Sequence, residues 1–578
     1  MNTYFRFANN LLLPAFAAFL VVSCAPKESS FSLSHSSEST VIAYDGLGGT
    51  EEYLLLPIQD DAPVVPMQYK SADDGEITLM VRFARERVDY TMPLQLNGPQ
   101  DIVVNKIDST AIAWQKLTLA DQYVTGDDEY RPSYHFAPHH GWMNDPNGMV
   151  YKDGEYHLFY QHNPYASNWS NMHWGHAVSR DLVNWEHLPD ALAPDSLGQI
   201  YSGSCIVDKY NAAGWGKDAI IAFYTSHGKA ETQCVAYSLD NGRTFIKYDK
   251  NPVLTSPSWN FRDPKVLYHA SSEKYIMAVT AGTCIEFYSS TNLKEWSFES
   301  KFGETYGWHT GCVWECPDLV ELPAADGSDA SHWVLVVNIN PGAPQGGSAT
   351  QYFVGSFDGK EFVCNDEPSE VKWLDYGLDH YAAVTWANAP EDRTIAIAWM
   401  SNWQYANQVP TCWFRSANTI ARDLFLFEYD GEQYVGSAPS KEIEAFRQPT
   451  TDFSTADEVC FTLERTAEPA RFSMCNATGE HLDFEIDFAE GVVTVDRTMS
   501  GISDFSDAFA SKIVGPLLGE DCDVRLFVDK ASVELFINGG RTAMTNTVFP
   551  VEPYDQLIFA QPENASKLEM YTINPTKQ

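Results

Sequence analysis

Three short segments place carboxylates at or beside prolines, and these residue types suit acid–base chemistry. They are residues 142–148 (WMNDPNG), 261–264 (FRDP) and 314–318 (WECPD), which carry Asp145, Asp263 and Glu315. Residues 145–148 also have the order of a type I turn, which predicts that Asp145 is held at the end of a strand. Hydrolysis of glycosidic bonds typically uses a pair of carboxylates. Three such groups in a chain with 13% aromatic residues therefore indicate chemistry on sugars.

The immediate neighbours of these carboxylates predict different protonation states. Glu315 lies between Trp314 and Cys316, and apolar neighbours favour the neutral acid by desolvation. Asp263 follows Arg262, a cation that favours the ionised carboxylate and is itself a candidate for binding sugar oxygens. Adjacent residues of a strand point to opposite faces, so an Arg262 side chain that faces away is also compatible with the sequence. A single Asp in a turn often has only a structural capping role, but the joint occurrence of the three segments favours a catalytic site.

The same three segments resemble the signature blocks of glycoside hydrolase family 32, the fructan hydrolases and invertases. The likeness continues through residues 161–164 (QHNP), 172–177 (MHWGHA), 201–204 (YSGS), 399–403 (WMSNW) and 528–536 (VDKASVELF). It covers roughly residues 130 to 578 and leaves out the stretch from about 30 to 125. The resemblance implies an all-β chain in which a five-bladed β-propeller catalytic domain is followed by a C-terminal β-sandwich.

The resemblance also implies a role for each carboxylate. Asp145 is expected to be the nucleophile that attacks the anomeric carbon of a fructosyl unit, in a retaining mechanism with a covalent fructosyl-enzyme intermediate. Glu315 is expected to be the acid/base, and Asp263 the group that stabilises the transition state and holds fructose hydroxyls. Neither a metal nor an organic cofactor is implied.

Further positions match family residues that line the pocket for the terminal fructose. These expected substrate contacts are Asn144, Gln161, Trp169, Tyr201 and Ser202. The family more often has Phe where Tyr201 stands. Trp399 and Trp403 are expected either to form aromatic walls of the pocket or to pack inside a blade. His139 and His140 are expected to be packing or hydrogen-bonding groups rather than metal ligands.

The resemblance favours exo action from a chain end, because endo-acting members often alter the aspartates of the first or third block and Asp145 and Asp318 are standard here. Residues 411–415 (TCWFR) depart from the Pro-Trp-Arg that is common in the family. The expected substrate is a fructan (levan or inulin) or a fructo-oligosaccharide, with the linkage left open. The alternatives are an endo-acting levanase or inulinase, a fructosyltransferase, and a non-catalytic fructan-binding lipoprotein, which need not keep all three carboxylates.

Composition limits the partners and the domain count. The 578 residues include 78 acidic and 38 basic ones, a formal charge of −40. Such a surface argues against binding to nucleic acid or anionic lipid. The length predicts two or three domains. The eleven cysteines show no compact disulfide or zinc spacing, and Cys312 and Cys316 beside Glu315 are interpreted as buried apolar fillers.

The N-terminus has the pattern of a targeting segment, predicted as a lipoprotein signal peptide over residues 1–23. Its apolar run, residues 11–22, is too short for a stable transmembrane anchor. Residues 21–25 (VVSCA) resemble a bacterial lipobox, which implies lipidation of Cys24, although an ordinary secretory signal with an incidental Cys is the alternative. The protein is thus expected in the bacterial cell envelope, attached to the membrane only through this lipid and facing the periplasm rather than the cell surface. Residues 24–40 are predicted to be a flexible tether.

The remaining chain divides by its β patterns. Residues 41–125 predict a small β-rich accessory domain, and residues 130–433 the propeller. Within the latter, an Asp or Asn follows a Ser/Thr position and precedes an aromatic residue at Asp181, Asp240, Asn292 and Asp358. This repeat predicts propeller blades, with residues 395–427 as part of a fifth, although unrelated hairpins of a sandwich are the alternative. Residues 434–578 contain a clean polar–apolar alternation at 482–488, which predicts the β-sandwich.

Overall fold

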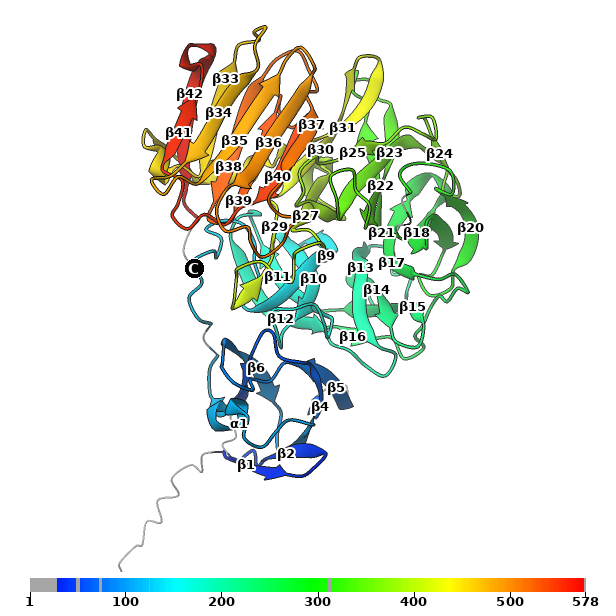
Figure 1. The fold of residues 1–578 in the computed structure, drawn as a ribbon. Coiled ribbons are helices and arrows are strands. Elements are labelled where there is room, and N and C mark those ends of the chain that lie inside the picture. The colour runs from blue at the N-terminus through cyan, green and yellow to red at the C-terminus, as the bar shows by residue number, and fades with distance from the viewer. Residues whose placement is uncertain are drawn as a thin grey trace, which may run out of the picture.

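The structure, a computed structural model, describes residues 29–47, 52–71, 75–123, 125–309, 311 and 313–575. The predicted signal peptide and Cys24 lie outside these residues. Figure 1 shows three β-rich regions in chain order: a small N-terminal domain in blue, a propeller from cyan to yellow-green, and a sandwich in orange and red. In the described part of the chain, no helix has the length and apolar character needed to cross a bilayer.

The propeller consists of five antiparallel sheets around a common axis. Its innermost strands are β9 (Gly141–Lys152), β13 (Gln199–Asp208), β17 (Phe261–His269), β21 (Val313–Pro323) and β26 (Tyr381–Thr385). Each of these strands contacts the next, and β26 contacts β9, so the ring is closed. This closure confirms the propeller and excludes the alternative of unrelated hairpins in a sandwich.

Outer strands complete each blade in sequence order. The first four blades add β10 (Glu155–Asn163), β11 (His173–Ser179) and β12 (Trp185–Leu192); β14 (Ala219–His227), β15 (Glu231–Ser238) and β16 (Ile246–Lys247); β18 (Lys274–Ala281), β19 (Ile285–Ser290) and β20 (Ser297–Phe302); and β22 (Ser331–Asn340), β23 (Ala349–Phe357) and β24 (Phe362–Cys364). The fifth adds β27 (Ile395–Met400), β30 (Arg422–Tyr429) and β31 (Glu432–Pro439). Because β31 ends at Pro439, the predicted boundary at residue 433 falls inside the last blade.

The sequence repeat is the turn between the third and fourth strands of the first four blades. In every case the side-chain oxygen of the repeated residue accepts a backbone N–H three or four residues later. The bonds are Asn184 to Asp181 at 2.7 Å, Thr244 to Asp240 at 2.9 Å, Glu295 to Asn292 at 2.9 Å and Glu361 to Asp358 at 2.9 Å. Short Asp and Asn side chains are suited to closing such turns, which explains why they recur once per blade.

All five inner strands carry an irregularity of register at the same level of the ring. The pairing shifts between Met143 and Pro146, Tyr201 and Gly203, Arg262 and Lys265, Glu315 and Asp318, and Tyr381 and Val384. A β-bulge re-aims side chains, and it tolerates proline because the bulged residue needs no ladder N–H. The predicted turn that ends a strand at Asp145 is therefore wrong, since β9 continues through the bulge to Lys152.

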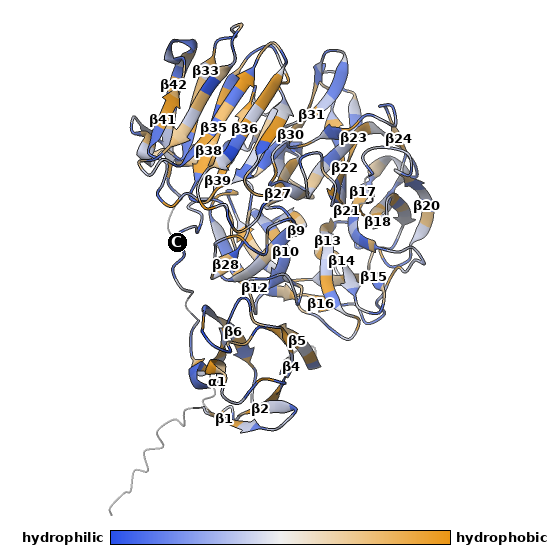
Figure 2. Cartoon of the chain, in the orientation of Figure 1, coloured by the Kyte–Doolittle hydropathy of each residue, from blue (hydrophilic) through white to orange (hydrophobic). Residues whose placement is uncertain are grey.

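The C-terminal region is the predicted β-sandwich. One sheet contains β32 (Arg447–Thr450), β42 (Ala565–Ile573), β33 (Glu458–Leu463), β38 (Asp523–Asp529), β39 (Ser532–Ile537) and β40 (Thr542–Thr547). The other contains β37 (Lys512–Pro516), β36 (Val492–Met499), β35 (His481–Asp487), β34 (Ala470–Cys475) and β41 (Gln556–Phe559). Every second residue of β35 is buried, as its alternation predicts, and Figure 2 shows apolar and polar positions mixed along these strands.

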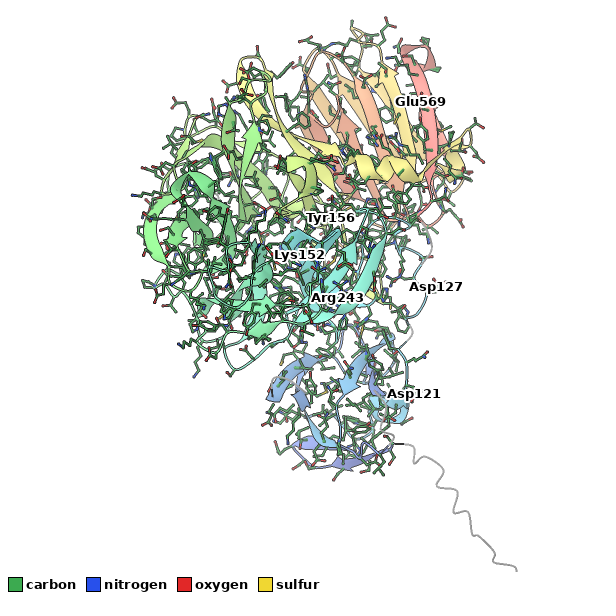
Figure 3. The ribbon with its side chains drawn as sticks, turned by 180° about the vertical axis from the view of Figure 1, so that it is seen from behind. Asp121, Asp127, Lys152, Tyr156, Arg243 and Glu569 are labelled. Carbon is green, nitrogen blue, oxygen red and sulfur yellow. The ribbon has the colours of Figure 1, made fainter. Side chains whose placement is uncertain are left out.

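The accessory domain has two small sheets and one short helix, α1 (Ile112–Lys116). The first sheet is ordered β1 (Phe31–His35), β2 (Ser39–Tyr44), β7 (Gln100–Asn105), β4 (Val65–Ser71) and β5 (Gly75–Val81), and the second β6 (Tyr90–Leu96), β3 (Glu52–Ile58) and β8 (Thr118–Ala120). Strand β1 and the first two residues of β2 lie within the predicted tether, residues 24–40, so the domain begins earlier than predicted. Figure 3 shows Asp121 of this domain and Glu569 of the sandwich on opposite sides of the propeller residues Lys152 and Arg243.

A buried ionic cluster joins the propeller to the sandwich. His135 donates or accepts at both ring nitrogens, with Nδ1 2.8 Å from Asp529 and Nε2 2.7 Å from Glu534. Arg422 pairs with the same Glu534 and lies 2.8 Å from Asp375. These side chains are at most 2% exposed. We define these five residues as the interface cluster.

The interface cluster favours the charged form of its members. Burial opposes the charge of His135, but hydrogen bonds and the charges of the two carboxylates raise its pKa to about 9. Burial likewise opposes ionisation of Asp529 and Glu534. His135 and backbone N–H groups nevertheless lower the pKa of Asp529, and Arg422 and His135 lower the pKa of Glu534. The pKa of Asp375 falls to about 2 because nearby cationic groups and hydrogen bonds outweigh its burial.

Candidate active site

A pocket of about 420 Å³ opens at the level of the five bulges. Among the predicted site residues it is lined by Asp145, Asp263 and Glu315, together with Asn144, Gln161, Trp169, Tyr201, Ser202 and Arg262. The three carboxylates come from β9, β17 and β21, the inner strands of three different blades. Ring closure thus brings together side chains that are distant in the sequence.

Asp145 is a buried carboxylate, and one of its two oxygens accepts hydrogen bonds from the protein. Its Oδ2 accepts the Ser202 hydroxyl at 2.7 Å and lies 3.4 Å from the Cys316 thiol. Its Oδ1 has no hydrogen-bond partner among the described residues. Burial raises the pKa of Asp145, and the charge of Glu315 adds to this effect while the Ser202 hydrogen bond opposes it. One oxygen is therefore held in place while the other is available to a ligand in the pocket.

Asp263 occupies a strained backbone conformation. Its φ is +66°, in the left-handed region that costs a non-glycine residue about 1 kcal/mol or more. The Thr225 hydroxyl accepts its backbone N–H at 2.9 Å, and the Cys316 N–H donates to its Oδ2 at 3.0 Å. Burial raises the pKa of Asp263 to about 8, with Glu315 and Asp145 adding to the rise and Arg262 opposing it.

Glu315 is held by polar groups at both oxygens. Arg262 donates to Oε1 from Nη2 at 2.8 Å and from Nε at 3.1 Å, and the Tyr381 hydroxyl donates to Oε2. The prediction of apolar surroundings, made from Trp314 and Cys316, is therefore wrong for the carboxyl group. The Glu315 side chain is 20% exposed. These donors orient Glu315 toward the pocket that it lines.

Arg262 is the central cation of the pocket. The bulge in β17 interrupts strand alternation, so Arg262 and Asp263 both line the pocket and the predicted possibility of an outward Arg262 is excluded. Its Nη1 also donates to Asn260 at 2.9 Å and to Glu231 at 3.3 Å. Burial opposes its charge, but the surrounding carboxylates, Glu315 first, raise its pKa.

Sequence analysis missed a group of lining residues on the second blade. His227 stacks on Tyr201 with ring centroids 4.2 Å apart and planes 3° apart, and its Nδ1 lies 3.2 Å from Glu231. Both residues line the pocket. They belong to the hairpin of β14 and β15, which has no motif in the sequence, so only strand pairing places them here.

Two of the three tryptophans predicted for the pocket form its aromatic wall. Trp403 and Trp169 line the pocket, with ring centroids 6.5 Å apart and an edge-on arrangement. Trp399, a predicted substrate contact, is fully buried behind Trp403 and does not line it. The packing alternative therefore holds for Trp399, whereas Trp169, 39% exposed, stands at the rim.

Comparison with known proteins agrees with this geometry. Residues 135–462 match the glycosyl hydrolases family 32 N-terminal domain, and residues 431–575 match the family 32 C-terminal domain. The chain belongs to glycosyl hydrolases family 32. Residues 46–134, which include most of the accessory domain, match a domain of unknown function, DUF4980.

Several relatives of this family 32 chain are named for fructan cleavage. A levanase of Bacillus subtilis (strain 168) is 43% identical over 482 residues, covering 78% of this chain and 71% of the relative. An extracellular exo-inulinase of Aspergillus niger is 37% identical over 487 residues, with 73% and 90% covered. The crystal structure of an exo-inulinase from Aspergillus awamori matches with a TM-score of 0.72 at 33% identity, covering 78% of this chain and 99% of that one. A β-fructofuranosidase from Schwanniomyces occidentalis complexed with fructosyl-erythritol matches with a TM-score of 0.69 at 32% identity, with 77% and 98% covered.

A buried ion pair joins two inner strands of this family 32 enzyme, β17 and β21. Lys265, two residues beyond Asp263, donates to Asp318 at 2.8 Å, and the Thr385 hydroxyl also donates to Asp318 at 3.0 Å. Asp318 is fully buried and does not line the main pocket. The aspartate of the third sequence block is therefore a structural residue.

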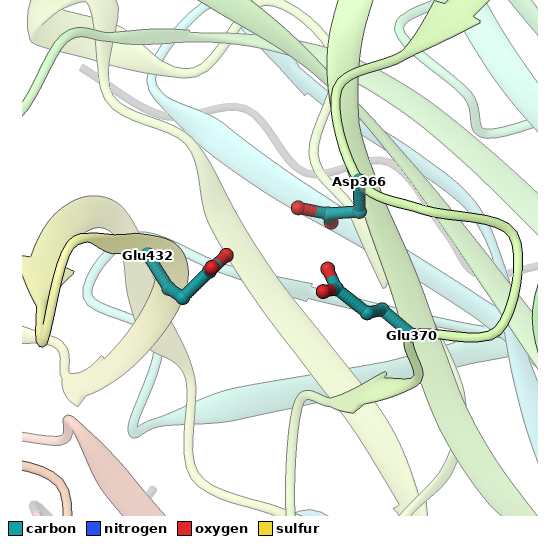
Figure 4. A group of neighbouring side chains, drawn as sticks. All are labelled: Asp366, Glu370 and Glu432. Carbon is teal, nitrogen blue, oxygen red and sulfur yellow. The ribbon is translucent and has the colours of Figure 1, made fainter.

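Other groups with potential for metal binding are already paired. Asp366, Glu370 and Glu432 lie together near the outer edge of the fourth and fifth blades (Figure 4), but the Lys372 ammonium is 2.8 Å from Asp366 and 3.5 Å from Glu432. His139 packs against His187 with ring centroids 3.7 Å apart, in line with the predicted packing role.

Proposed function

We propose that this glycoside hydrolase of family 32 is a retaining, exo-acting β-fructosidase that releases fructose from fructans or fructo-oligosaccharides. The observation that carries the proposal is the convergence of Asp145, Asp263 and Glu315 on one pocket from three blades. Family membership makes the chain a hydrolase of β-fructosidic bonds. The finer assignment rests on how each carboxylate is held.

The contacts support separate roles for two of the carboxylates. Asp145 acts as the nucleophile, because Ser202 holds one oxygen and the other is free of partners among the described residues. It forms a bond to the anomeric carbon of fructose while the glycosidic bond breaks. Glu315, oriented by Arg262 and Tyr381, gives its proton to the leaving oxygen and then takes a proton from the water that hydrolyses the covalent intermediate.

Asp263 serves as the group that binds fructose hydroxyls as positive charge develops on the sugar. Its Oδ2 accepts the Cys316 N–H and lies 3.7 Å from the Cys316 thiol, so the carboxyl group is fixed at the pocket that it lines. Such groups, fixed before the reaction, stabilise transition-state charge without reorganisation. Tyr201, Trp169 and Trp403 provide the apolar and aromatic surface against which a sugar ring packs.

Exo action is supported by Asp145 and Asp318 of the first and third sequence blocks, which keep the residues that endo-acting members of the family often alter. Relatives named exo-inulinase are consistent with the same mode.

The decisive experiment follows products over time from levan, inulin and sucrose incubated with the purified protein. Early release of fructose alone supports exo action, whereas a ladder of oligosaccharides identifies an endo enzyme. New oligosaccharides at high sucrose concentration identify a transferase. No release from any of the three substrates contradicts the enzymatic proposal, and the matched Asp145→Asn protein serves as the background control.

We further propose that Cys24 carries a lipid that anchors the enzyme in the cell envelope, and that the anchored enzyme faces the periplasm. The support is the sequence of residues 21–25, which lies outside the described residues. A Cys24→Ala variant is expected in the soluble fraction, and the native protein in the membrane fraction. Cleavage by protease added to intact cells contradicts the periplasmic orientation.

A further inference from the structure

The accessory domain contacts the loop that carries Trp169. This rim loop, residues 164–172, connects β10 to β11. Its Tyr165 is buried in the hydrophobic core of the accessory domain, where its hydroxyl lies 3.3 Å from that of Tyr69. Its Ser167 N–H donates at 3.1 Å to the hydroxyl of Tyr90, a residue of β6. The base of the rim loop is therefore part of the accessory domain's own packing.

Asn171 pairs the rim loop with an exposed sheet edge. Strand β5 is the last strand of its sheet, so the outward backbone groups of Met80 lack a strand partner. The Asn171 side chain replaces that partner: its Oδ1 accepts the Met80 N–H at 2.8 Å and its Nδ2 donates to the Met80 carbonyl at 2.9 Å. Asn171 is 4% exposed, so both bonds are shielded from water.

A second loop links the same domain to the other rim tryptophan. The loop of residues 401–413 carries Trp403, and its Asn407 side chain accepts the backbone N–H of Trp169 at 3.1 Å. Arg415, just beyond this loop, donates to the Asn407 carbonyl at 2.8 Å and to Asp60 of the accessory domain at 3.2 Å. The Tyr90 hydroxyl donates to Asp60 at 2.8 Å. One tyrosine thus connects both loops.

We propose that the accessory domain is a positioning module for the sugar-binding rim, fixing Trp169 and Trp403 so that the units of a fructan beyond the terminal one bind. The proposal rests on the proposed function, because it assumes a fructan substrate. Among the residues that the structure describes, none from the accessory domain lines the pocket, and the hydrogen-bond partners of the reacting carboxylates come from the propeller. Loss of the contacts should therefore weaken binding of long substrates and leave the chemical step intact.

This selectivity follows from the position of the two tryptophans. Trp169 is 39% exposed at the rim, whereas Asp145 and Asp263 are 9% and 5% exposed at the inner end. A sucrose molecule fills the inner end, and a polymer must also cross the rim. A tryptophan held in one orientation binds a sugar face with less loss of side-chain entropy than a mobile one.

The test compares Asn171→Gly and Tyr90→Phe with the native protein on sucrose and on the fructan that it cleaves fastest. Gly is chosen because Asn171 has φ +46°, which glycine adopts without strain. Each variant is expected to raise KM for the polymer about three- to tenfold, as the loss of two or three hydrogen bonds allows, and to change kcat on sucrose less than about twofold. Backbone hydrogen exchange of residues 164–172 should become faster.

The matched control is Tyr44→Phe, which removes a buried hydroxyl that bonds Glu52 within the accessory domain and away from both loops. It should alter neither KM nor exchange of the rim loop. A double-mutant cycle with Trp169→Ala adds a sharper readout, since Asn171→Gly should have little further effect on the polymer KM once Trp169 is absent.

Three outcomes overturn the inference. The first is an unchanged KM for the polymer although hydrogen exchange of the rim loop becomes faster, and the second is an equal loss of activity on sucrose and on the polymer. The third is that the effects of Asn171→Gly and Trp169→Ala on the polymer KM are fully additive. A native protein that releases no fructose from either substrate contradicts the proposed function instead. In that case the rate of backbone hydrogen exchange in residues 164–172 still shows whether the accessory domain holds the rim loop.

Discussion

Two groups of charged residues in this enzyme differ in how many cations accompany their carboxylates. The pocket gathers Asp145, Asp263, Glu315 and Glu231 around one guanidinium, that of Arg262, with His227 at its edge. The interface cluster sets Asp375, Asp529 and Glu534 against Arg422 and His135. Burial opposes ionisation of Asp145 and Asp263 in the first group and of Asp529 and Glu534 in the second, so the nearby charges decide in which direction each of these pKa values moves.

The pKa directions follow that balance. In the pocket, burial and neighbouring carboxylates raise the pKa of Asp145 and Asp263, whereas at the interface cationic partners lower the pKa of Asp529 and Glu534. An acid with a raised pKa stores unfavourable free energy when it ionises in the folded protein. The comparison indicates that the reactive carboxylates of the pocket lower the stability of the fold, while the interface cluster holds two domains together.

The largest difference is expected in turnover. Asp145→Asn and Glu315→Gln should each lower kcat by a factor on the order of 10³ or more, because each removes a group that makes or breaks bonds. Steady-state kinetics on sucrose and the preferred fructan measures the effect. Asp529→Asn, a matched carboxylate change in the interface cluster, should leave kcat of the folded enzyme nearly unchanged. Near-native turnover by Glu315→Gln contradicts its assignment as acid/base.

The next largest effect is expected on stability from His135→Ala. The change removes the ring partner of both Asp529 and Glu534, and loss of one member of a buried ion pair costs about 3–5 kcal/mol. Denaturant unfolding at pH 7 measures this loss, while kcat of the folded fraction should not change. A stability loss below about 1 kcal/mol is inconsistent with a clamping role for the cluster.

The same variant should change the response to alkaline pH. The folded pKa of His135 is about 9, above the ordinary value of 6.5, so its contribution is complete below about pH 6.5 and lost as pH rises through 9. His135→Ala should lack this decline. Both proteins should still lose stability in acid, where Asp529 and Glu534, whose folded pKa values are lowered, become protonated.

Asp263 in the pocket should make the stability of the enzyme depend on pH in the opposite direction from the carboxylates of the interface cluster. The folded pKa of Asp263 is about 8 against an ordinary 3.8, so the folded state holds a proton that the unfolded state has released. Stability contributed by this group therefore falls as pH rises from about 4 to 8. Asp263→Asn should remove that slope and be more stable than the native enzyme at pH 8, by on the order of 2–4 kcal/mol. Thermal melting curves of both proteins from pH 4 to 8 measure this difference. If the stability of the two proteins changes with pH in parallel, the prediction is wrong.

The smallest effects come from single hydroxyl deletions in the two groups. Tyr381→Phe removes a donor to Glu315 and should lower kcat about tenfold with little loss of stability. Thr545→Val removes the hydroxyl that donates to Asp375 and accepts from Arg422, and should cost about 1–2 kcal/mol of stability with kcat unchanged. If both variants lost activity and stability alike, the division of roles between pocket and interface would fail.

The sequence by itself determined the elements and the reactive groups. Asp145, Asp263 and Glu315 occur in short motifs, and the Asp or Asn turn of the first four blades depends on residues only three or four positions away. Strand alternation at residues 482–488 is equally local and predicted β35. Patterns of this kind are encoded within a few neighbours, so a single chain is sufficient to find them.

Only the tertiary structure decided which side chains share the pocket. Bulges turn Arg262 and Asp263 to the same side, and blade packing buries Trp399 while leaving Trp403 at the wall. The same holds for Asp529 in the conserved-looking block of residues 528–536, whose partner His135 lies almost four hundred positions earlier. Likewise, the accessory domain meets the rim loop through Asn171 and the edge of β5. Such contacts depend on ring closure and domain docking, which bring together residues whose local sequences carry no sign of each other.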